Sequence, residues 1–290
     1  MTKILPTLTN ENKPGQLYVV ATPIGNLGDL SHRAIQTLSS VDLIACEDTR
    51  HTKKLCRYLN ISKPLISYFR EKEQEKAEAL LEMLRAGKRI ALVSDAGTPA
   101  ICDPGAILVK KARAAGIEII AISGPSALAT ALSIAGLTQS SFFFGGFLPA
   151  NATERRRVLK NVANLPFPLI FYESPHRISA AFIDMMALLG DRYAMLFREL
   201  TKIHDECLEG GLSILQEQVK EGVKGELVLI VEGAAPPPVE KPGNLEELLL
   251  WYRDEMQSSL KNAVSSIASD LDLPRSQVYR EALLIWHKTV

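Results

Sequence analysis

The sequence predicts an α/β protein: two α/β domains with a ligand cleft between them, followed by a small helical module. Three observations lead to this fold class. Short apolar runs alternate with longer stretches of helical periodicity along most of the 290 residues. A chain of this length is typical of a protein with two domains. The proline-rich stretch "AAPPPVEKPG" at 234–243 then changes the composition sharply and indicates a stiff linker before the last helical patterns.

The first domain, 15–135, is expected to contain a mostly parallel sheet. Its strands are predicted at 17–22, 43–46, 65–68, 89–94 and 117–122. Helices are predicted between them at 31–39, 51–58, 71–86 and 105–115. The helix at 71–86 places Ala77, Leu80, Leu81 and Leu84 on one face, and Gly87 ends it. Strands that are apolar throughout indicate a sheet with helices on both faces.

The second domain, 136–235, shows a similar alternation. Its strands are predicted at 141–147, 168–172, 193–200 and 225–233, and its helices from Thr153, from Pro175 and near 213–222. Residues 1–14 are expected to be a flexible tail and 236–243 the linker. The three helical patterns of 244–290 are expected to form a module resembling a helix-turn-helix. Its predicted core is Ala263, Ile267, Ala268, Val278 and Leu283.

Composition limits the classes of function. The chain carries 33 basic and 33 acidic residues, so its overall charge does not indicate a nucleic-acid-binding protein, although a local basic patch is compatible with it. Four scattered cysteines without C-x-x-C spacing make zinc improbable and suit reduced thiols in a cytoplasmic protein. The N-terminal residues do not resemble a signal peptide, and no apolar run is long enough to span a membrane.

Five predicted strands end in loops with unusual residues, and these loops are where we expect a ligand. The loops are "ATPIGNLGDLS", "CEDTRHT", "SDAGTPAICDPG" and "SGPSA" from the first domain and "YESPHR" from the second. Open α/β sheets bind ligands beyond the carboxyl ends of their strands. If these ends converge, they line one cleft between the domains.

Two nucleotide-binding motifs fit the loops poorly. Gly25 and Gly28 follow a strand, with Glu47 about twenty residues on, as in a dinucleotide site. However, the first glycine of that motif is missing and the next helix is expected only after Ser31, its N-cap. The loop "SDAGTPAICDPG" has no lysine in P-loop spacing, which argues against nucleoside triphosphates. Its stiff backbone suits adenine or a carboxylate, or simply a tight strand-to-helix turn.

Charged residues cluster in two of these loops. "CEDTRHT" contains Glu47, Asp48, Arg50 and His51, which form either a site at the sheet edge or a solvated surface. "YESPHR" contains Tyr172, Glu173, His176 and Arg177, with Pro175 as the expected first helical residue. Ser174 is then a candidate N-cap. The runs "FREKE" (69–73) and "RRR" (155–157) are exposed basic groups that either hold phosphates or keep the surface soluble.

Taken together and in order, these motifs resemble the tetrapyrrole (corrin/porphyrin) methylase superfamily. The resemblance rests on "LYVVATPIGNLGDLSHRAIQTLSSVDLIACEDTRHT", "LVSDAGTPAICDPG", "ISGPSALATALSIAGL", "FYESPHRI" and "GELVLIVEG", and it covers about 15–290. It implies an S-adenosylmethionine cleft between the two domains. Where tetrapyrrole relatives usually carry a G-D-P-like turn, this chain has Gly97, Thr98 and Pro99, which favours the branch that acts on ribosomal RNA.

For that branch the resemblance implies 2′-O-methylation of a cytidine ribose in the decoding centre of 16S rRNA. The implied substrate is the assembled small ribosomal subunit, and the implied assembly is a homodimer. A cytoplasmic location is expected from the cysteine pattern. The positions that match the family's cofactor contacts are Ile24, Thr98, Ile101, Ser126, Ala127, Tyr172 and Leu227.

A ribose hydroxyl is a poor nucleophile, so a carboxylate that takes its proton would help the reaction. The candidate bases are Asp95, Glu47, Asp48 and Glu173, with Asp95 preferred because it stands at a strand end beside the cofactor loop. Asp103 is expected near the N-cap of the next helix. The candidate RNA-binding residues are Arg50, Arg70, Lys72, His176 and Arg177, together with Arg275 and Arg280 of the helical module. The module alternatively serves packing alone.

Two other functions stay open at this point. One is methylation of a small tetrapyrrole by S-adenosylmethionine, which needs neither a basic rim nor the helical module. The other is a non-catalytic factor that binds the ribosome and keeps the cleft as a relic. No metal is expected in any of these cases.

Overall fold

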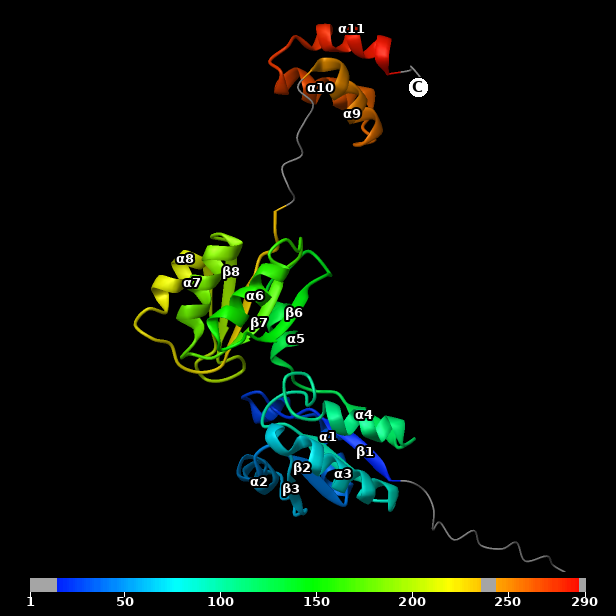
Figure 1. Cartoon of the computed structure of the whole chain (residues 1–290), viewed down its shortest axis with the longest axis vertical. Helices are drawn as coiled ribbons and strands as arrows, with labels where there is room; N and C mark the ends of the chain where they lie inside the picture. The colour runs from blue at the N-terminus through cyan, green and yellow to red at the C-terminus, as the bar shows by residue number, and fades with distance from the viewer. Residues whose placement is uncertain (1–14, 236–243, 287–290) are drawn as a thin grey trace, which may run out of the picture. The chain divides into compact units, whose positions relative to one another are not determined.

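The computed structural model describes residues 15–235 and 244–286. The predicted tail and linker, and the last four residues, lie outside these ranges. The chain divides into two compact units, Met1–Ala234 and Ala235–Val290. The first unit contains two separate five-stranded sheets, and the second contains three helices (Figure 1). The predicted α/β class is confirmed.

The first sheet is parallel throughout and has the strand order β3-β2-β4-β1-β5. Its strands are β1 (Gln16–Val20), β2 (Leu43–Cys46), β3 (Leu65–Ser67), β4 (Ile90–Val93) and β5 (Glu118–Ile122). Every residue of β2 and β4 is buried, as the continuous apolar runs predict. Because the strands are parallel, their carboxyl ends meet at one edge, where the predicted site loops begin.

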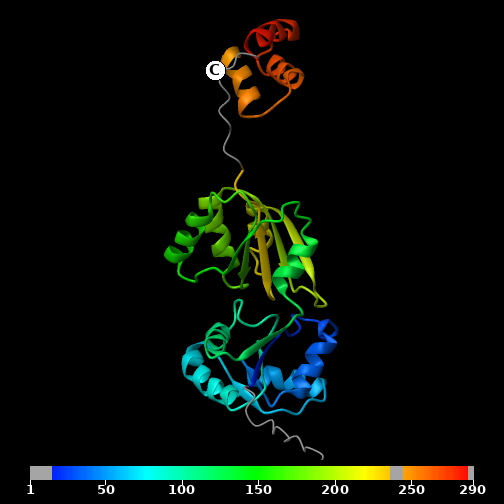
Figure 2. The ribbon, with the colours of Figure 1, turned by 90° about the vertical axis from the view of Figure 1, so that its right-hand side faces the viewer.

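Helices cover both faces of this sheet. They are α1 (His32–Ser40), α2 (Thr49–Tyr58), α3 (Glu73–Arg85) and α4 (Ala106–Ala114), with short 3₁₀ turns at Leu27–Asp29 and Arg70–Lys72. One core joins α3 and α4 to Leu17 and Leu92, and the other joins α1 and α2 to Val20 and Val93. Figure 2 shows the two pairs on opposite sides of the strands.

The second sheet is mixed and has the order β6-β7-β10-β8-β9. Its strands are β6 (Phe143–Phe147), β7 (Leu169–Glu173), β8 (Tyr193–Arg198), β9 (Glu206–Gly211) and β10 (Leu227–Val231). Only β6 and β7 pair in parallel, whereas β10 runs antiparallel to β7 and β8. The start of β10 therefore lies beside the end of β7, with Leu227 opposite Glu173. This pairing brings the last predicted motif to the same edge as "YESPHR".

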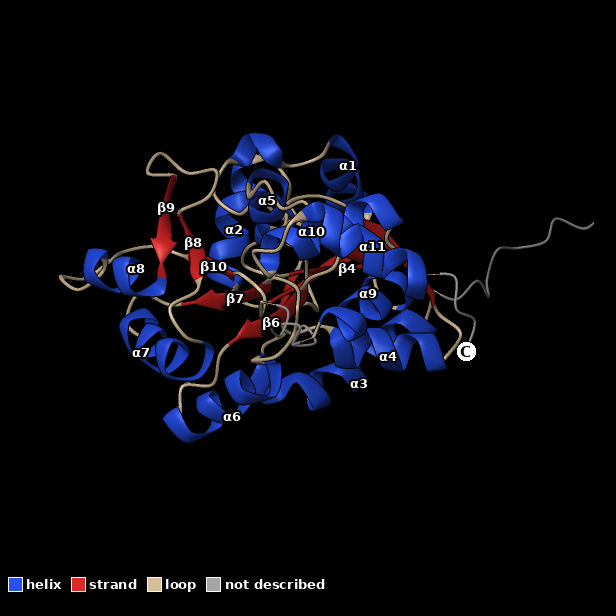
Figure 3. Ribbon diagram, turned by 90° about the horizontal axis from the view of Figure 1, so that it is seen from above, coloured by secondary structure: helices blue, strands red, loops and turns tan. Residues whose placement is uncertain are grey.

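Helices α6 (Ala152–Val162), α7 (Ile178–Leu189) and α8 (Leu212–Gln218) pack on one face of the second sheet (Figure 3). The other face is covered by α5 (Ala127–Ile134). In that core Ala131 of α5 lies with Ile170, Val228 and Ile230. Ile24, from the loop after β1, joins the same core, so the two sheets are tied together through it.

Several local expectations are confirmed. The Ser31 hydroxyl accepts a hydrogen bond from the Ala34 amide and caps α1. The four predicted apolar residues of α3 are buried, and Gly87 follows this helix with φ +89°. Gly97 takes the expected positive φ, +76°.

Other expectations are wrong. Helix α7 begins at Ile178, so Pro175 is not its first residue; the Ser174 carbonyl, not its hydroxyl, accepts the Arg177 and Ile178 amides. Helix α4 begins after Gly105 without a side-chain cap, so Asp103 does not cap it. Strand β9 was not predicted, because it is an exposed edge strand with no apolar run. In the run 155–157, Arg155 is buried rather than exposed.

The second unit is a three-helix module with its own core. Its helices are α9 (Leu245–Asp254), α10 (Leu260–Asp270) and α11 (Arg275–Ile285). Ala263, Ile267, Ala268 and Val278 are buried as predicted, whereas Leu283 is exposed. The residues that close the core on α11 are Ala282 and Ile285, which follow Val278 on the buried face at the i+4 and i+7 positions.

Candidate functional site

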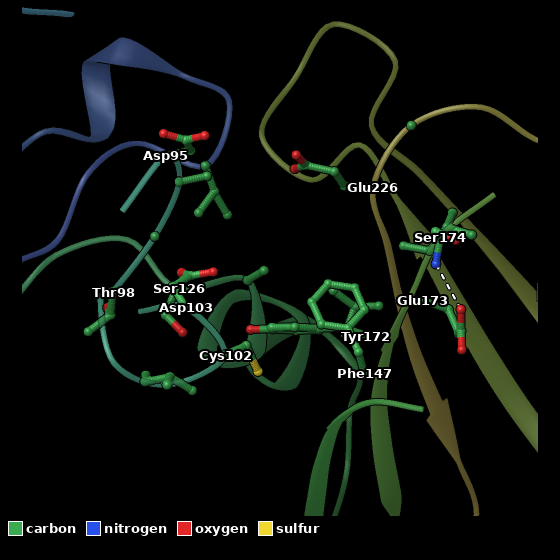
Figure 4. A pocket seen from close by; sticks show the side chains of 18 of the residues that line it. Asp95, Thr98, Cys102, Asp103, Ser126, Phe147, Tyr172, Glu173, Ser174 and Glu226 are labelled. Atoms are coloured by element: carbon green, nitrogen blue, oxygen red, sulfur yellow. Dashed lines mark hydrogen bonds between the residues drawn. The ribbon is translucent and has the colours of Figure 1, made fainter. Parts of the chain in front are cut away.

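A cavity of about 430 Å³, the first cavity, lies where the strand-end loops of the two sheets meet (Figure 4). This volume is in the range of small-molecule sites. Its walls come from the ends of β2, β4, β5 and β7 and from the start of β10. The residues that line it are Ile24, Glu47, 95–98, 101–103, Ser126, Ala127, Phe147, 172–175 and 225–228.

The loop after β4 is held firmly at one wall. Thr22 and Gly97 exchange backbone hydrogen bonds, with N···O distances of 2.8 and 3.0 Å. The Thr98 hydroxyl donates to the Pro125 carbonyl at 3.2 Å and joins this loop to the one after β5. Gly105 has φ +143°, and a side chain there would collide with Leu92. The backbone groups of this loop are therefore presented to the cavity in a fixed arrangement.

Aromatic rings form the wall on the side of the second sheet. The Tyr172 hydroxyl accepts a hydrogen bond from the Leu128 amide in the first turn of α5, at 3.0 Å. Its ring packs edge-on against Phe144 and Phe147. Burial raises the pKa of Tyr172 to about 12, so the phenol keeps its proton at neutral pH.

Five acidic residues line the first cavity: Glu47, Asp95 and Asp103, together with Glu173 and Glu226, which are paired with Arg177 and Lys202. Burial raises the pKa of Glu47, and the neighbouring charges of Asp103 and Asp95 raise it further. Burial likewise raises the pKa of Asp103, with Asp95 adding to the effect. Arg70 opposes both shifts, and its guanidinium donates to the Cys102 carbonyl at 2.6 Å. The site favours a positively charged ligand group over an anion.

The structure places all of the residues expected to contact the cofactor on this cavity. Ile24, Thr98, Ile101, Ser126, Ala127, Tyr172 and Leu227 each line it, although they come from distant parts of the sequence. Two apolar side chains on the cavity, Ile101 and Phe147, are 49% and 53% exposed, which leaves apolar surface for a ligand to cover.

The four candidate bases differ in whether their carboxylates lie on the first cavity and in whether other residues already bind them. Asp95 and Glu47 line the first cavity. Asp48 lies outside its lining: it caps α2 and pairs with Arg50, whose hydrogen bonds lower the pKa of Asp48 to about 2. Glu173 lines the cavity, but its carboxylate accepts a hydrogen bond from the Ser174 amide (Figure 4). It also accepts from Arg177. These bonds leave Glu173 poorly placed to accept a substrate proton.

The candidate RNA-binding residues differ in their exposure and in whether they are paired with other residues. Lys72 and His176 are exposed, and Arg70 is beside the cavity. Arg50 is exposed but paired with Asp48. Arg177 donates to both oxygens of Glu173 and to the Leu148 carbonyl, so its guanidinium is already occupied. Arg275 and Arg280 are exposed on α11, in the second unit.

Three residues that line the first cavity, Asp103, Phe147 and Glu226, were not predicted from the sequence to lie at the site. The sequence indicates a position near a helix cap for Asp103 and a place in a strand for Phe147, and neither pattern indicates a ligand contact. Glu226, which precedes β10, had no signal beyond its place before an apolar run. Within 15–235 and 244–286, no group of three or more His, Cys, Asp or Glu side chains is arranged to hold a metal ion. None of the helices in these ranges is both long and apolar enough to cross a membrane.

The model of the family "Tetrapyrrole (Corrin/Porphyrin) Methylases" matches residues 16–215. The chain belongs to this family. Among its relatives, a protein of Xylella fastidiosa is 44% identical over 92% of this chain and 98% of the relative, and one of Escherichia coli O157:H7 is 44% identical over 94% and 96%. A third, from Bacillus subtilis, is 39% identical over 91% and 93%. All three are named ribosomal RNA small subunit methyltransferase I, and the chain is a member of that group.

Solved structures agree with this membership at the level of the fold. Uroporphyrin III C-methyl transferase from Thermus thermophilus aligns with a TM-score of 0.56 at 17% identity, over 74% of this chain and 97% of that one. Diphthine synthase aligns with a TM-score of 0.60 at 16% identity, over 75% and 90%. A further Thermus thermophilus structure of the transferase is a complex with S-adenosyl homocysteine. The two-sheet unit is thus the tetrapyrrole methylase fold.

Proposed function

We propose that this protein uses S-adenosylmethionine to methylate the RNA of the small ribosomal subunit, at the ribose 2′-oxygen of a cytidine in the decoding centre of 16S rRNA. The main observation behind the proposal is the lining of the first cavity. The seven residues that the family resemblance predicts as cofactor contacts lie on it, beside a cluster of carboxylates. Membership of the small subunit methyltransferase I group supports the RNA substrate over a tetrapyrrole.

The chemistry of the cavity fits S-adenosylmethionine. When bound, this cofactor supplies a methyl group activated on a positively charged sulfur. Asp95, Asp103 and Glu47 favour that charge, whereas a site for an anionic ligand would carry cations. Ile24, Ile101 and Leu227 offer apolar surface to an adenosine, and the backbone of the rigid loop at Ala96–Thr98 offers donors and acceptors to its polar edge.

The chain's own task is to place the ribose hydroxyl and to remove its proton. Holding two reactants in position is a large part of the catalytic effect expected for such a transfer. Asp95 is the base in this proposal, because its carboxylate lies on the cavity while its Oδ1 accepts the Asp48 amide at 3.1 Å, which fixes its orientation. Its charge contributes to the raised pKa of Glu47 and of Asp103 on the same cavity.

The experiment compares labelled-methyl transfer to isolated small subunits, to free 16S rRNA and to a tetrapyrrole. We expect transfer to the subunits, at a ribose that then resists alkaline cleavage of the RNA. Transfer to the tetrapyrrole alone would refute the RNA substrate. Binding of S-adenosylmethionine in calorimetry with no transfer to any of the three would support a non-catalytic factor instead.

Asp95→Asn tests the base. Asparagine keeps the oxygen that accepts the Asp48 amide, so the loop is retained while the proton acceptor is removed. We expect transfer to fall by about 10²- to 10⁴-fold, with S-adenosylmethionine still binding in calorimetry. Glu47→Gln and Asp103→Asn are the matched comparisons. If Asp95→Asn turns over normally and one of the others does not, the base is that other carboxylate.

The assembly and location of the protein stay predictions. We propose a homodimer, as the family resemblance implies, and a cytoplasmic location, as the cysteine pattern indicates. Light scattering coupled to size-exclusion chromatography measures the first, and a single monomer mass at working concentration would contradict it.

A further inference from the structure

A second cavity, of about 510 Å³, adjoins the first. The two share Ile24, Ala96, Asp95 and Glu226 in their linings. The carboxylates of Asp95 and Glu226 occupy the same end of the first cavity, apart from Thr98 and Asp103 (Figure 4). A group in the second cavity and a group in the first can therefore both reach Asp95.

One face of α2 forms the outer wall of the second cavity. His51, Lys54, Leu55 and Tyr58 line it, at the i, i+3, i+4 and i+7 spacing of a single helix face. The buried residues of α2, Thr52 and Cys56, lie elsewhere on the helix. This face combines two basic side chains with an apolar and an aromatic one. Leu55 packs partly against the core under α2, whereas Tyr58 is 63% exposed.

The charge of the second cavity is mixed, because Lys54, Lys202 and His51 line it together with Asp95 and Glu226. Lys54 and His51 make no side-chain hydrogen bond or ion pair with any residue that the structure describes. Lys202, on the facing wall, is within 2.7 Å of Glu199 and 3.3 Å of Glu226. Its pairing holds Glu226 at the wall shared by the two cavities and leaves Lys54 and His51 available to an anion.

The wall that faces α2 across the second cavity is formed by the loops after β1 and β8. The Thr201 hydroxyl accepts a hydrogen bond from the Asn26 amide at 3.2 Å, which joins the loop after β8 to the loop after β1. Thr201 has φ +67°, a costly conformation for a β-branched residue. A side chain at Gly25 would collide with Lys202. Gly25 thus allows the Lys202 side chain to lie close to the loop after β1, on the lining of the second cavity.

We propose that the second cavity binds the acceptor nucleotide of the RNA, an inference that rests on the proposed function. A single unstacked ribonucleotide presents a phosphate, a flat base and a ribose. Lys54 and His51 bind the phosphate, the Tyr58 ring stacks with the base beside Leu55, and the ribose lies at the shared wall near Asp95. The acidic first cavity repels phosphates, so the backbone stays on the α2 side.

Kinetics of methyl transfer to small subunits test the site with three variants and a control. Stacking of one base on an aromatic ring corresponds to a roughly 5- to 150-fold effect on binding, so Tyr58→Ala should lower kcat/KM within that range, and Tyr58→Phe should retain most of it. Lys54→Glu should lower kcat/KM at least about tenfold. Lys53→Ala, an exposed neighbour on α2 outside the lining, is the control. Affinity for S-adenosylmethionine should stay within about twofold throughout.

Two measurements keep the failure of this site distinct from the failure of the proposed function. If the wild type methylates subunits and Tyr58→Ala and Lys54→Glu match it in kcat/KM, the nucleotide site is refuted and the function stands. If the wild type methylates no RNA, equilibrium binding of cytidine 3′,5′-bisphosphate decides: binding that Lys54→Glu weakens and Lys53→Ala does not supports the site. Equal binding by both variants, or none by the wild type, overturns it.

Discussion

Replacing Arg177 with alanine separates a structural role from an RNA-binding role for this residue. Arg177 donates to Glu173 from Nε at 3.1 Å and from Nη2 at 3.2 Å, and to the Leu148 carbonyl at 2.9 Å. The Glu173 side chain is 1% exposed, and that of Arg177 is 31% exposed. The alanine variant therefore leaves a buried carboxylate with only the Ser174 amide as a donor.

Removing one partner of a buried ion pair typically costs 3–5 kcal/mol in the free energy of unfolding. Because water reaches part of Arg177, we expect the lower end, about 3 kcal/mol. In a unit of this size each kcal/mol changes Tm by roughly 2–4 °C, so Tm should fall by roughly 6–12 °C. Arg177→Met combined with Glu173→Gln should recover much of that loss, because no buried charge remains.

The assay is thermal unfolding followed by circular dichroism, with methyl transfer measured well below the lowered Tm. His176→Ala is the control for the unfolding measurement, because His176 is exposed and adjacent in sequence. We expect the Arg177→Ala protein, while folded, to bind small subunits with near wild-type affinity. A wild-type Tm together with a large loss of affinity for the subunits would refute the structural interpretation and assign Arg177 to the RNA.

Two further predictions concern stability and subunit binding. Asp184 is buried and accepts hydrogen bonds from Arg155 at 2.8 Å and from Arg156 at 2.6 Å. Asp184→Asn should therefore lower the free energy of unfolding, measured in urea, by about 3–5 kcal/mol. Arg157 is exposed in the same run, so the control Arg157→Ala should change this free energy by less than about 0.5 kcal/mol. Burial tends to raise the pKa of Asp184, but the two arginines outweigh it and the net pKa is lowered, so its stabilisation is complete above the unfolded value near 3.9 and is lost as the pH falls through the folded value. A wild-type acid-unfolding curve for Asp184→Asn would contradict this. Deleting 240–290 should weaken binding to small subunits and leave the affinity for S-adenosylmethionine intact, as measured by filter binding and calorimetry; equal loss of both would show that the module supports the fold instead.

The parts of the fold that the sequence revealed are those where burial imposes a pattern. Strands β2 and β4 are buried on both faces and read as continuous apolar runs, and α3 buries one regular stripe. Strand β9 escaped prediction because neither of its faces is well buried. The start of α7 was misplaced because Pro175 is typical of a first helical turn, yet here it lies in a preceding turn held by the Ser174 carbonyl.

The site was predictable to the extent that its residues follow strand ends, which converge for topological reasons. The seven residues expected at the cofactor were identified by resemblance to a family, and the parallel first sheet together with the β7–β10 pairing explains why they meet. The second cavity had no such signal. Lys54 and Tyr58 belong to a helix face that reads as ordinary surface, and Lys202 lies far away in the sequence.

The placement of Lys54 and His51 on the second cavity bears on how a neutral chain can bind RNA. Equal numbers of acidic and basic residues give no general attraction to phosphates. The second unit does not supply it either, since residues 244–286 contain seven acidic and four basic residues. Binding through a few placed cations implies few released counterions and a shallow salt dependence. The proposed site needs the shape of a presented nucleotide more than a long phosphate track, which is consistent with an assembled subunit, rather than free RNA, as the substrate.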